Sequence, residues 1–192
     1  GANFERGGAV SCWVRNDDSG KWNHTLVRHG SNSGGVRWVP RDLQVYRDKV
    51  TGVERIFLLL GNPGIISGVY DPGEVSRIRW DRHVEFPFLT KGTFFTRPLG
   101  IAQANHALHF SEGPSIFRRI DGERPKYEEI LNLAEDTDTD VGGIRGLTAI
   151  KNPNGKGQSL LFVWAPGERS QSQVKRLDPD GKGGYTLHNE AN

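Results

Sequence analysis

Three arginines recur in the same tripeptide, Arg-x-Leu, and each stands where a short apolar segment begins. They are Arg41, Arg97 and Arg145. A guanidinium carries a permanent charge and five donors in a planar fork, which suits a carboxylate, sulfate or phosphate. If the three groups converge, they predict a binding site for a small polar or anionic ligand.

A structural role for these arginines is the alternative. Three aspartates also recur once per unit, each at the end of an apolar strand: Asp71, Asp121 and Asp178. A charge that repeats with the architecture usually belongs to the scaffold, as an ion pair or a turn cap. The pattern then predicts that most of the arginines engage an aspartate or a backbone carbonyl.

An acidic loop is the candidate metal site. Asp136, Asp138 and Asp140 alternate with threonines and can present several hard oxygens to Ca²⁺. An EF-hand would need glycine at the sixth position and glutamate at the twelfth, where this loop has Val141 and Leu147. The loop is therefore a calcium site of another kind or a solvated connection between strands.

Other reactive side chains lack catalytic spacing. The six histidines form no HExxH motif, and no serine has a GxSxG context. His106 and His109 are three residues apart, which puts them on opposite faces of a strand. The one cysteine, Cys12, cannot form an intramolecular disulfide, and we expect a buried small hydrophobe. The sequence carries no dinucleotide or phosphate-loop fingerprint, so we expect no organic cofactor.

Tryptophan is the residue type here that could stack on the ring of a sugar. Trp13, Trp22 and Trp80 belong to the repeated pattern described below, and repeated aromatic residues are usually core. Trp38 lies outside that pattern, beside the glycine-rich segment 30–35. It is therefore the tryptophan that we predict to contact a ligand.

Short β-branched and aromatic runs, separated by glycine and proline, predict many short strands and little helix. Three segments repeat one order: a strand that follows Arg-x-Leu, a very apolar second strand, a third strand that ends in aspartate, and a fourth marked by an aromatic residue. The second strands are residues 56–60, 107–110 and 160–164. The aromatic markers are Trp80, Tyr127 and Tyr185, and Trp22 begins the same kind of strand in an incomplete first unit.

A four-stranded unit at this spacing is typical of a β-propeller blade. One sheet cannot bury both of its faces alone, whereas blades packed side by side cover each other. We therefore expect an all-β, propeller-like domain of four-stranded antiparallel blades, about three and a half of them, in residues 1–192, or a fragment of a larger propeller. The partial blade spans residues 9–27, and the others span about 41–88, 97–133 and 144–189. A missing N-terminal portion or a partner chain would complete the first blade.

The repeat resembles the propeller superfamily in general, which includes sialidase-like, WD-repeat and hemopexin-like proteins. The turn Asp18-Ser19-Gly20-Lys21-Trp22 looks like the Asp-box turn of sialidase-type blades, without the residue between glycine and the aromatic. In that family the box is structural, so this resemblance implies a fold and not an active site. It also implies that Arg41, Arg97 and Arg145 lie near one mouth of a central channel.

Composition narrows the range of partners. The formal net charge is +2 and no basic block is present, so we expect no nucleic-acid partner. No apolar run approaches the ~20 residues that span a bilayer, so we expect a soluble protein without a membrane partner. The sequence has no methionine, and removal of a signal peptide on export is one explanation.

Three classes of function are compatible with these patterns. A binding module for a small polar ligand or a carbohydrate ranks first, because no catalytic motif is present. A hydrolase or lyase with its site at the channel mouth is the second class, and a protein-interaction scaffold is the third. Fold alone does not choose among them.

Overall fold

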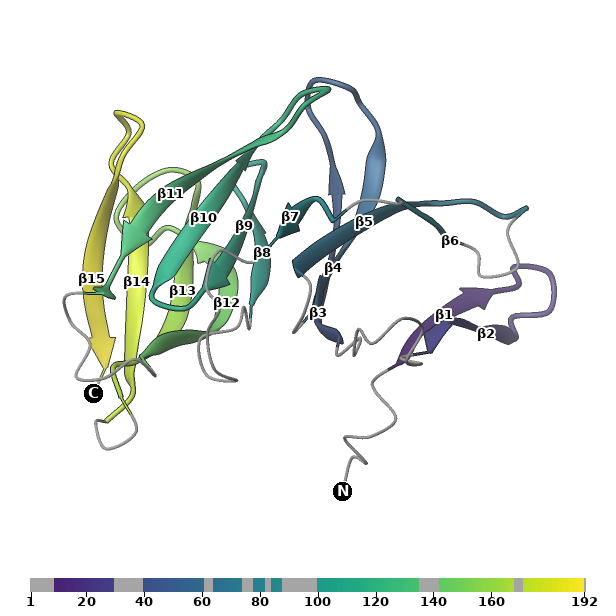
Figure 1. Cartoon of the computed structure of the whole chain (residues 1–192), viewed down its shortest axis with the longest axis horizontal. Helices are drawn as coiled ribbons and strands as arrows, with labels where there is room; N and C mark the ends of the chain where they lie inside the picture. Colours follow the sequence, from purple (N-terminus) through teal and green to yellow (C-terminus); the bar gives the residue numbers. More distant parts are fainter. Residues whose placement is uncertain are drawn as a thin grey trace.

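The computed structural model describes residues 9–29, 40–60, 64–73, 78–81, 84–87, 100–134, 142–167 and 171–191. These residues form strands and turns without an α-helix, so the predicted all-β class is confirmed (Figure 1). Within the same residues, no helical segment has the length and apolar character needed to cross a bilayer.

The strands form four antiparallel sheets, which we call A to D in chain order. Sheet A is a hairpin of β1 (Ala9–Arg15) and β2 (Trp22–His29). Sheet B contains β3 (Pro40–Arg47), β4 (Glu54–Leu60), β5 (Gly64–Tyr70), β6 (Ile78–Trp80) and β7 (Phe86–Pro87). Sheet C contains β8 (Ile101–Ala104), β9 (Ala107–Glu112), β10 (Ser115–Ile120) and β11 (Lys126–Asn132). Sheet D contains β12 (Gly143–Lys151), β13 (Gln158–Ala165), β14 (Gln173–Pro179) and β15 (Tyr185–Ala191).

Each of sheets B, C and D is a meander in which strands that follow one another in sequence pair with one another. The orders are β3-β4-β5-β6, β8-β9-β10-β11 and β12-β13-β14-β15, and the short β7 pairs with the start of β5. The predicted order of four antiparallel strands is therefore confirmed in three units. Trp80, Tyr127 and Tyr185 all lie on the fourth strands, where the repeat placed them.

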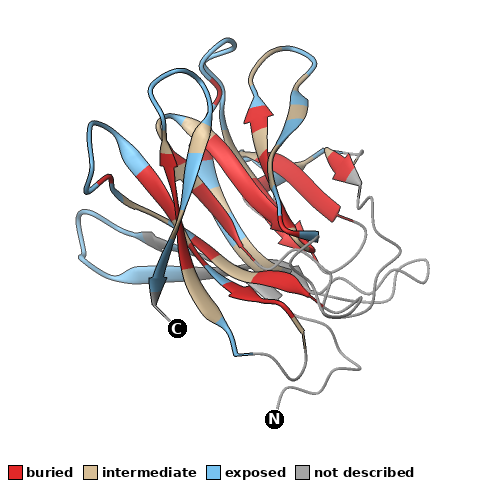
Figure 2. Ribbon diagram, turned by 90° about the vertical axis from the view of Figure 1, so that its left-hand side faces the viewer, coloured by how far each residue is buried: buried red, intermediate tan, exposed pale blue. Residues whose placement is uncertain are grey.

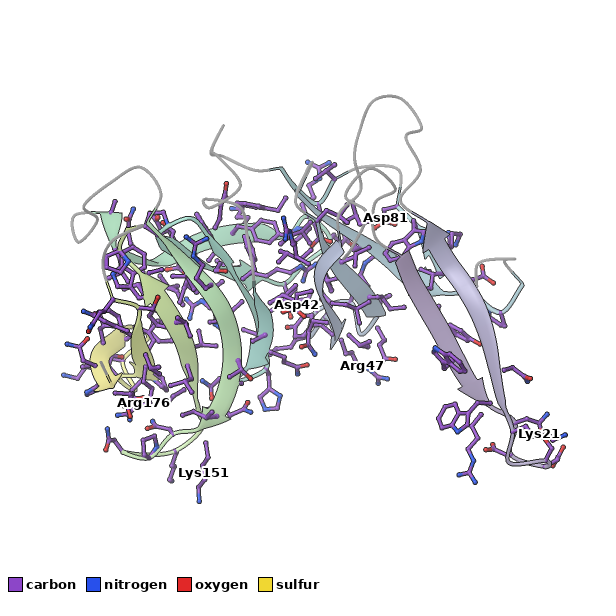
Figure 3. All side chains as sticks on the ribbon, turned by 90° about the horizontal axis from the view of Figure 1, so that it is seen from below. Lys21, Asp42, Arg47, Asp81, Lys151 and Arg176 are labelled. Atoms are coloured by element: carbon purple, nitrogen blue, oxygen red, sulfur yellow. The ribbon has the colours of Figure 1, made fainter. Side chains whose placement is uncertain are left out.

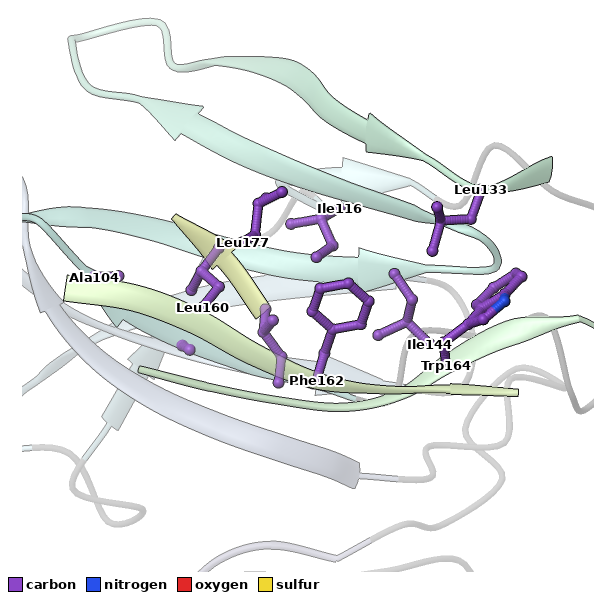
Figure 4. Close-up of a cluster of buried hydrophobic side chains, with 10 residues drawn as sticks. Ala104, Ile116, Leu133, Ile144, Leu160, Phe162, Trp164 and Leu177 are labelled. Atoms are coloured by element: carbon purple, nitrogen blue, oxygen red, sulfur yellow. The ribbon is translucent and has the colours of Figure 1, made fainter. Parts of the chain in front are cut away.

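Two apolar cores lie between the sheets. The core between sheets B and C is largely aromatic, and Phe110 stacks on Phe117 with ring centroids 5.4 Å apart. The core between sheets C and D joins Phe162 and Trp164 of β13 to Ile116 of β10 and its neighbours (Figure 4). Burial of these faces removes the largest apolar area from water, so sheet-on-sheet packing stabilises the fold.

The first strands of the three sheets lie next to one another, with β8 between β3 and β12. Asp42 of β3 accepts a hydrogen bond from the Ile101 backbone N–H at 3.0 Å, and Figure 3 shows Asp42 between sheets B and C. On the other side of β8, Asn105 forms hydrogen bonds with both the backbone and the side chain of Gln158. Hydrogen bonds between side chains and backbone groups thus join successive sheets at their first strands.

The second strands differ in how many of their faces are covered. Residues 57–60 of β4 are all buried, as the continuous apolar run predicted. In β13, Leu160, Phe162 and Trp164 are buried against sheet C, whereas Val163 is exposed. A continuous apolar run such as residues 160–164 predicts a strand that is buried on both faces. This prediction is wrong for sheet D, because no other described sheet covers its outer face.

The turns between first and second strands and between third and fourth strands gather at one end of the molecule, which we call the loop end. Its turns are residues 48–53, 105–106, 121–125, 152–157 and 180–184. Figure 2 shows these loops as exposed segments beyond the buried strands. The loop end is where polar side chains of neighbouring sheets meet.

The approach of β8 to β12 depends on Gly100. A Cβ added at Gly100 would lie 2.4 Å from the Leu147 backbone nitrogen, whereas one added at Gly146 would meet no atom within 4 Å. We expect Gly100→Ala to lower the free energy of unfolding by about 1–3 kcal/mol, because β8 and β12 must move apart to make room for the added methyl group. Gly146→Ala is the matched control and should change it by about 0.5 kcal/mol or less. Urea unfolding measures both, and equal effects would contradict the close packing of these strands.

Candidate functional site

The structure describes two of the three predicted arginines. Arg41 lies near the start of β3 and Arg145 near the start of β12, and both are half-buried. Burial lowers the pKa of Arg145 from its usual value. Arg97 and Trp38 lie outside the described residues, as do Asp136, Asp138 and Asp140. The convergence of the three arginines and the calcium site in the acidic loop therefore stay predictions. The residues that the structure does describe contain no group of three potential metal ligands.

All three recurring aspartates form ion pairs: Asp71 pairs with Arg79 of the neighbouring strand β6 at 3.7 Å, and the other two pair with the arginine two residues before them. Arg119 donates to Asp121 at 2.5 Å, and Arg176 donates to Asp178 at 2.7 Å. Residues two apart share a face of a strand, so this spacing brings the charges together. The sequence signal that we did not use is Arg-x-Asp at the end of the third strand, which occurs in two of the three units.

Arg119 is the centre of a buried charge cluster between sheets B and C. Its side chain is 3% exposed and donates to Asp48 at 2.8 Å, to Glu85 at 2.7 Å and to Asp121. We call these four residues the Arg119 cluster. Burial opposes the charge on the guanidinium, but hydrogen bonds to Glu85 and Asp48 raise the pKa of Arg119 above its usual value. Arg119 therefore stays protonated at any pH at which the protein folds.

Asp48 is held as a carboxylate. Burial favours its neutral form, but backbone N–H groups of Thr51 and Val50 and the Arg119 guanidinium donate to it and lower its pKa to about 2. Its carboxylate therefore caps the β3–β4 turn and holds sheet C at the same time.

Two tyrosines complete the junction between sheets B and C. The Tyr46 hydroxyl lies 2.5 Å from Asp121, and the Tyr127 hydroxyl donates to Glu85 at 2.5 Å. A cleft of about 580 Å³ opens beside the cluster, and its remaining ion pair joins Arg55 to Asp81. Because the charged groups here bond to one another, we assign this junction a structural role.

The junction between sheets C and D is open at the loop end. A groove of about 810 Å³ runs between the glycine-rich loops 152–157 and 180–184 on one side and Asn105 and Arg118 on the other. A second cavity, of about 410 Å³, shares Asn105, Arg118 and Tyr185 with it and continues to Tyr46 and Lys49 of sheet B. We call the two together the C–D groove.

Tyr185 stands where the two parts of the C–D groove meet. Like Tyr127 in sheet C, it lies on a fourth strand and faces the preceding sheet, but its hydroxyl lies 3.4 Å from His109 Nε2 instead of being held by a carboxylate. The Arg118 guanidinium lies 5.9 Å from the centre of the Tyr185 ring and also pairs with Glu128. The groove therefore contains a half-buried aromatic ring whose hydroxyl contacts His109 and the Arg118 guanidinium, with no carboxylate among these partners.

His109 lies beneath this tyrosine and is 1% exposed. Burial, with a smaller contribution from the Arg118 charge, lowers the pKa of His109 to about 4. The imidazole is therefore neutral at physiological pH. A neutral imidazole offers one donor and one acceptor to its neighbours.

The sheet D wall of the groove is polar. Asn154 Nδ2 donates to Asp178 at 3.0 Å, and Asp178 also accepts from Ser159 at 2.6 Å. Burial would raise the pKa of Asp178, but the donors Arg176, Ser159 and Asn154 lower it to about 2. His188 lies 3.3 Å from the same carboxylate. These groups do not have the order of a nucleophilic triad, because the buried Ser159 donates to the aspartate and not to the histidine.

Comparison with known proteins identified no relative. No protein-family model matches the chain, and neither curated proteins nor solved structures gave a match. The function of this chain must therefore be argued from the geometry of the C–D groove.

His109 should make stability depend on pH. Its folded-state pKa of about 4 lies below the usual 6.5, so the unfolded chain binds the proton more tightly and stability is lost as pH falls from about 6.5 towards 4. The contribution of this group is about 3 kcal/mol when the shift is fully expressed. We expect urea unfolding at neutral and at acid pH to show a smaller acid loss for His109→Phe than for the wild type.

The exposed neighbour His106 provides the matched control, since its side chain is not enclosed by the two sheets. His106→Phe should retain the acid loss of the wild type. Parallel pH profiles for His109→Phe and the wild type would show that His109 is not held neutral by burial.

Proposed function

We propose that sheets B, C and D are consecutive blades of a propeller-type protein and that the chain binds a small polar ligand in the C–D groove. A carbohydrate is the ligand class that the groove chemistry favours. The observation that carries this proposal is the contrast between the two junctions. The charged groups beside the cleft of sheets B and C pair with one another, whereas the larger groove of sheets C and D is lined by amides, glycines and the Tyr185 ring.

The blade arrangement is supported by two features of the packing. The first strands lie side by side in chain order, which is expected where blades surround an axis. Sheet C is covered on both faces, by sheet B through one core and by sheet D through the other. In repeat folds, each sheet packs against its neighbours in sequence order, and this packing buries faces that a single repeat cannot bury alone.

The ligand class follows from the groups that line the groove. Asn105, Asn152 and Asn154 line the groove with amides whose nitrogens already donate to Gln158, Lys156 and Asp178, so these amides are held in place and their oxygens retain acceptor capacity for a ligand. Glycines in both loops leave backbone groups accessible. Tyr185 supplies an aromatic ring beside them, and a ring next to hydrogen-bonding groups suits the apolar face and hydroxyls of a sugar. The volume of about 810 Å³ is in the range of small-molecule sites.

Truncation of Tyr185 tests this proposal. We would screen the full chain against a glycan array and titrate the best-bound saccharide by calorimetry. Tyr185→Ala should weaken its binding about tenfold or more, which corresponds to about 1.4 kcal/mol. The reason is that the ring supplies the apolar contact in a groove whose other lining groups are mostly polar.

The matched control is Tyr70→Ala, because Tyr70 is 52% exposed on sheet B and lies outside the groove. Its affinity for the saccharide should equal that of the wild type. Undiminished binding by Tyr185→Ala, or the absence of any bound saccharide on the array, would refute the carbohydrate assignment.

A further inference from the structure

The loop between β12 and β13 contains the sole Asn-Gly pair in the sequence, Asn154-Gly155. Both residues are exposed in a turn at the loop end. In such a pair the backbone nitrogen of the glycine can attack the side-chain amide carbon of the asparagine, and the lack of a Cβ on glycine leaves that approach unhindered. The position therefore combines a reactive dipeptide with access to water.

The local hydrogen bonds leave the attacking nitrogen available. The Asn152 N–H donates to the Gly157 carbonyl, and the Asn154 N–H donates to Asn152 Oδ1 at 2.9 Å. Within the described part of the chain, no hydrogen bond uses the Gly155 N–H. Loss of its proton therefore breaks no contact of the loop.

We propose that Asn154 is a site of spontaneous deamidation that alters the wall of the C–D groove. Hydroxide from the solvent removes the Gly155 N–H proton, and the nitrogen bonds to Asn154 Cγ. The Cγ–Nδ2 bond breaks as Nδ2 takes up a proton from water, which releases ammonia and leaves a succinimide. Water then opens the succinimide at either carbonyl and gives aspartate or isoaspartate. Water is the co-reactant, and no oxidation or reduction occurs.

The product changes a contact at the base of the loop. Asn154 Nδ2 is a donor to Asp178 Oδ2, and after deamidation an oxygen that carries negative charge takes its place. A favourable hydrogen bond becomes a repulsion between two carboxylates, since Asp178 is held in its charged form by Arg176 and Ser159. The modification therefore loosens loop 152–157, whether or not the groove binds a sugar.

Peptide mapping by mass spectrometry tests the chemical step. The purified full chain is incubated at mildly alkaline pH, and the amide-to-acid mass change should accumulate in the peptide that contains Asn154. Gly155→Ala is the matched variant, because its Cβ would meet only Asn152 Nδ2, at 3.4 Å, and the reaction should slow about tenfold or more. An equal rate in Gly155→Ala, or a faster mass change at Asn105 or Asn152, would overturn the proposal.

The structural consequence has a separate readout. Asn154→Asp introduces the product charge directly, and Asn154→Ala removes the hydrogen bond without adding charge. We expect hydrogen exchange in loop 152–157 to be faster in Asn154→Asp than in Asn154→Ala. Equal exchange in the two variants would show that charge repulsion with Asp178 does not loosen the loop.

Discussion

Burial of the Arg119 guanidinium among three carboxylates determines how sheets B and C pack against each other. Arg119 comes from sheet C, while Asp48 and Glu85 come from sheet B, so the cluster can form only when these sheets pack face to face. The apolar attraction in the core beneath it is non-directional, whereas the short charge-assisted hydrogen bonds of the cluster require a particular geometry. Its hydrogen bonds raise the pKa of Arg119, and the backbone N–H of Thr51 together with Arg119 lowers the pKa of Asp48. This interaction fixes sheet C, and sheet C then positions sheet D.

The second junction uses the same strand architecture with different side chains. Tyr127 and Tyr185 occupy corresponding fourth strands, yet Tyr127 is held by Glu85 of the preceding sheet and Tyr185 faces the neutral His109. At the loop end, sheets C and D are joined by the hydrogen bonds between Asn105 and Gln158, and a groove remains beside this contact. The repeat therefore supplies a scaffold, and the changes at a few equivalent positions create the candidate site, as expected when function is carried by sites and not by folds.

The strands could be predicted from the sequence because each is an apolar or β-branched run bounded by turn residues, as in residues 56–60 and 160–164. The Arg119 cluster could not be predicted from the sequence. Glu85 is 34 residues from Arg119 in the chain, and it lies in an irregular segment between β6 and β7. The repeated Arg-x-Leu tripeptides predicted a ligand site at Arg41, Arg97 and Arg145, two of which the structure describes, near the starts of β3 and β12. Tyr185 appeared in the sequence only as a marker of the repeat, since a sequence cannot show which aromatic ring borders an open groove.

A double-mutant cycle between Arg119 and Asp48 tests most directly whether the charge cluster locks the two sheets. Urea unfolding of Arg119→Met, Asp48→Asn and the double variant gives their coupling, and the exposed pair of Arg47 and Glu54 gives the reference cycle. We expect Arg119→Met to cost about 3–5 kcal/mol, because it leaves buried carboxylates unpaired. We also expect a coupling above about 1.5 kcal/mol, against about 0.5 kcal/mol or less for the surface pair. A coupling at Arg119 and Asp48 no larger than that of the surface pair would contradict this account.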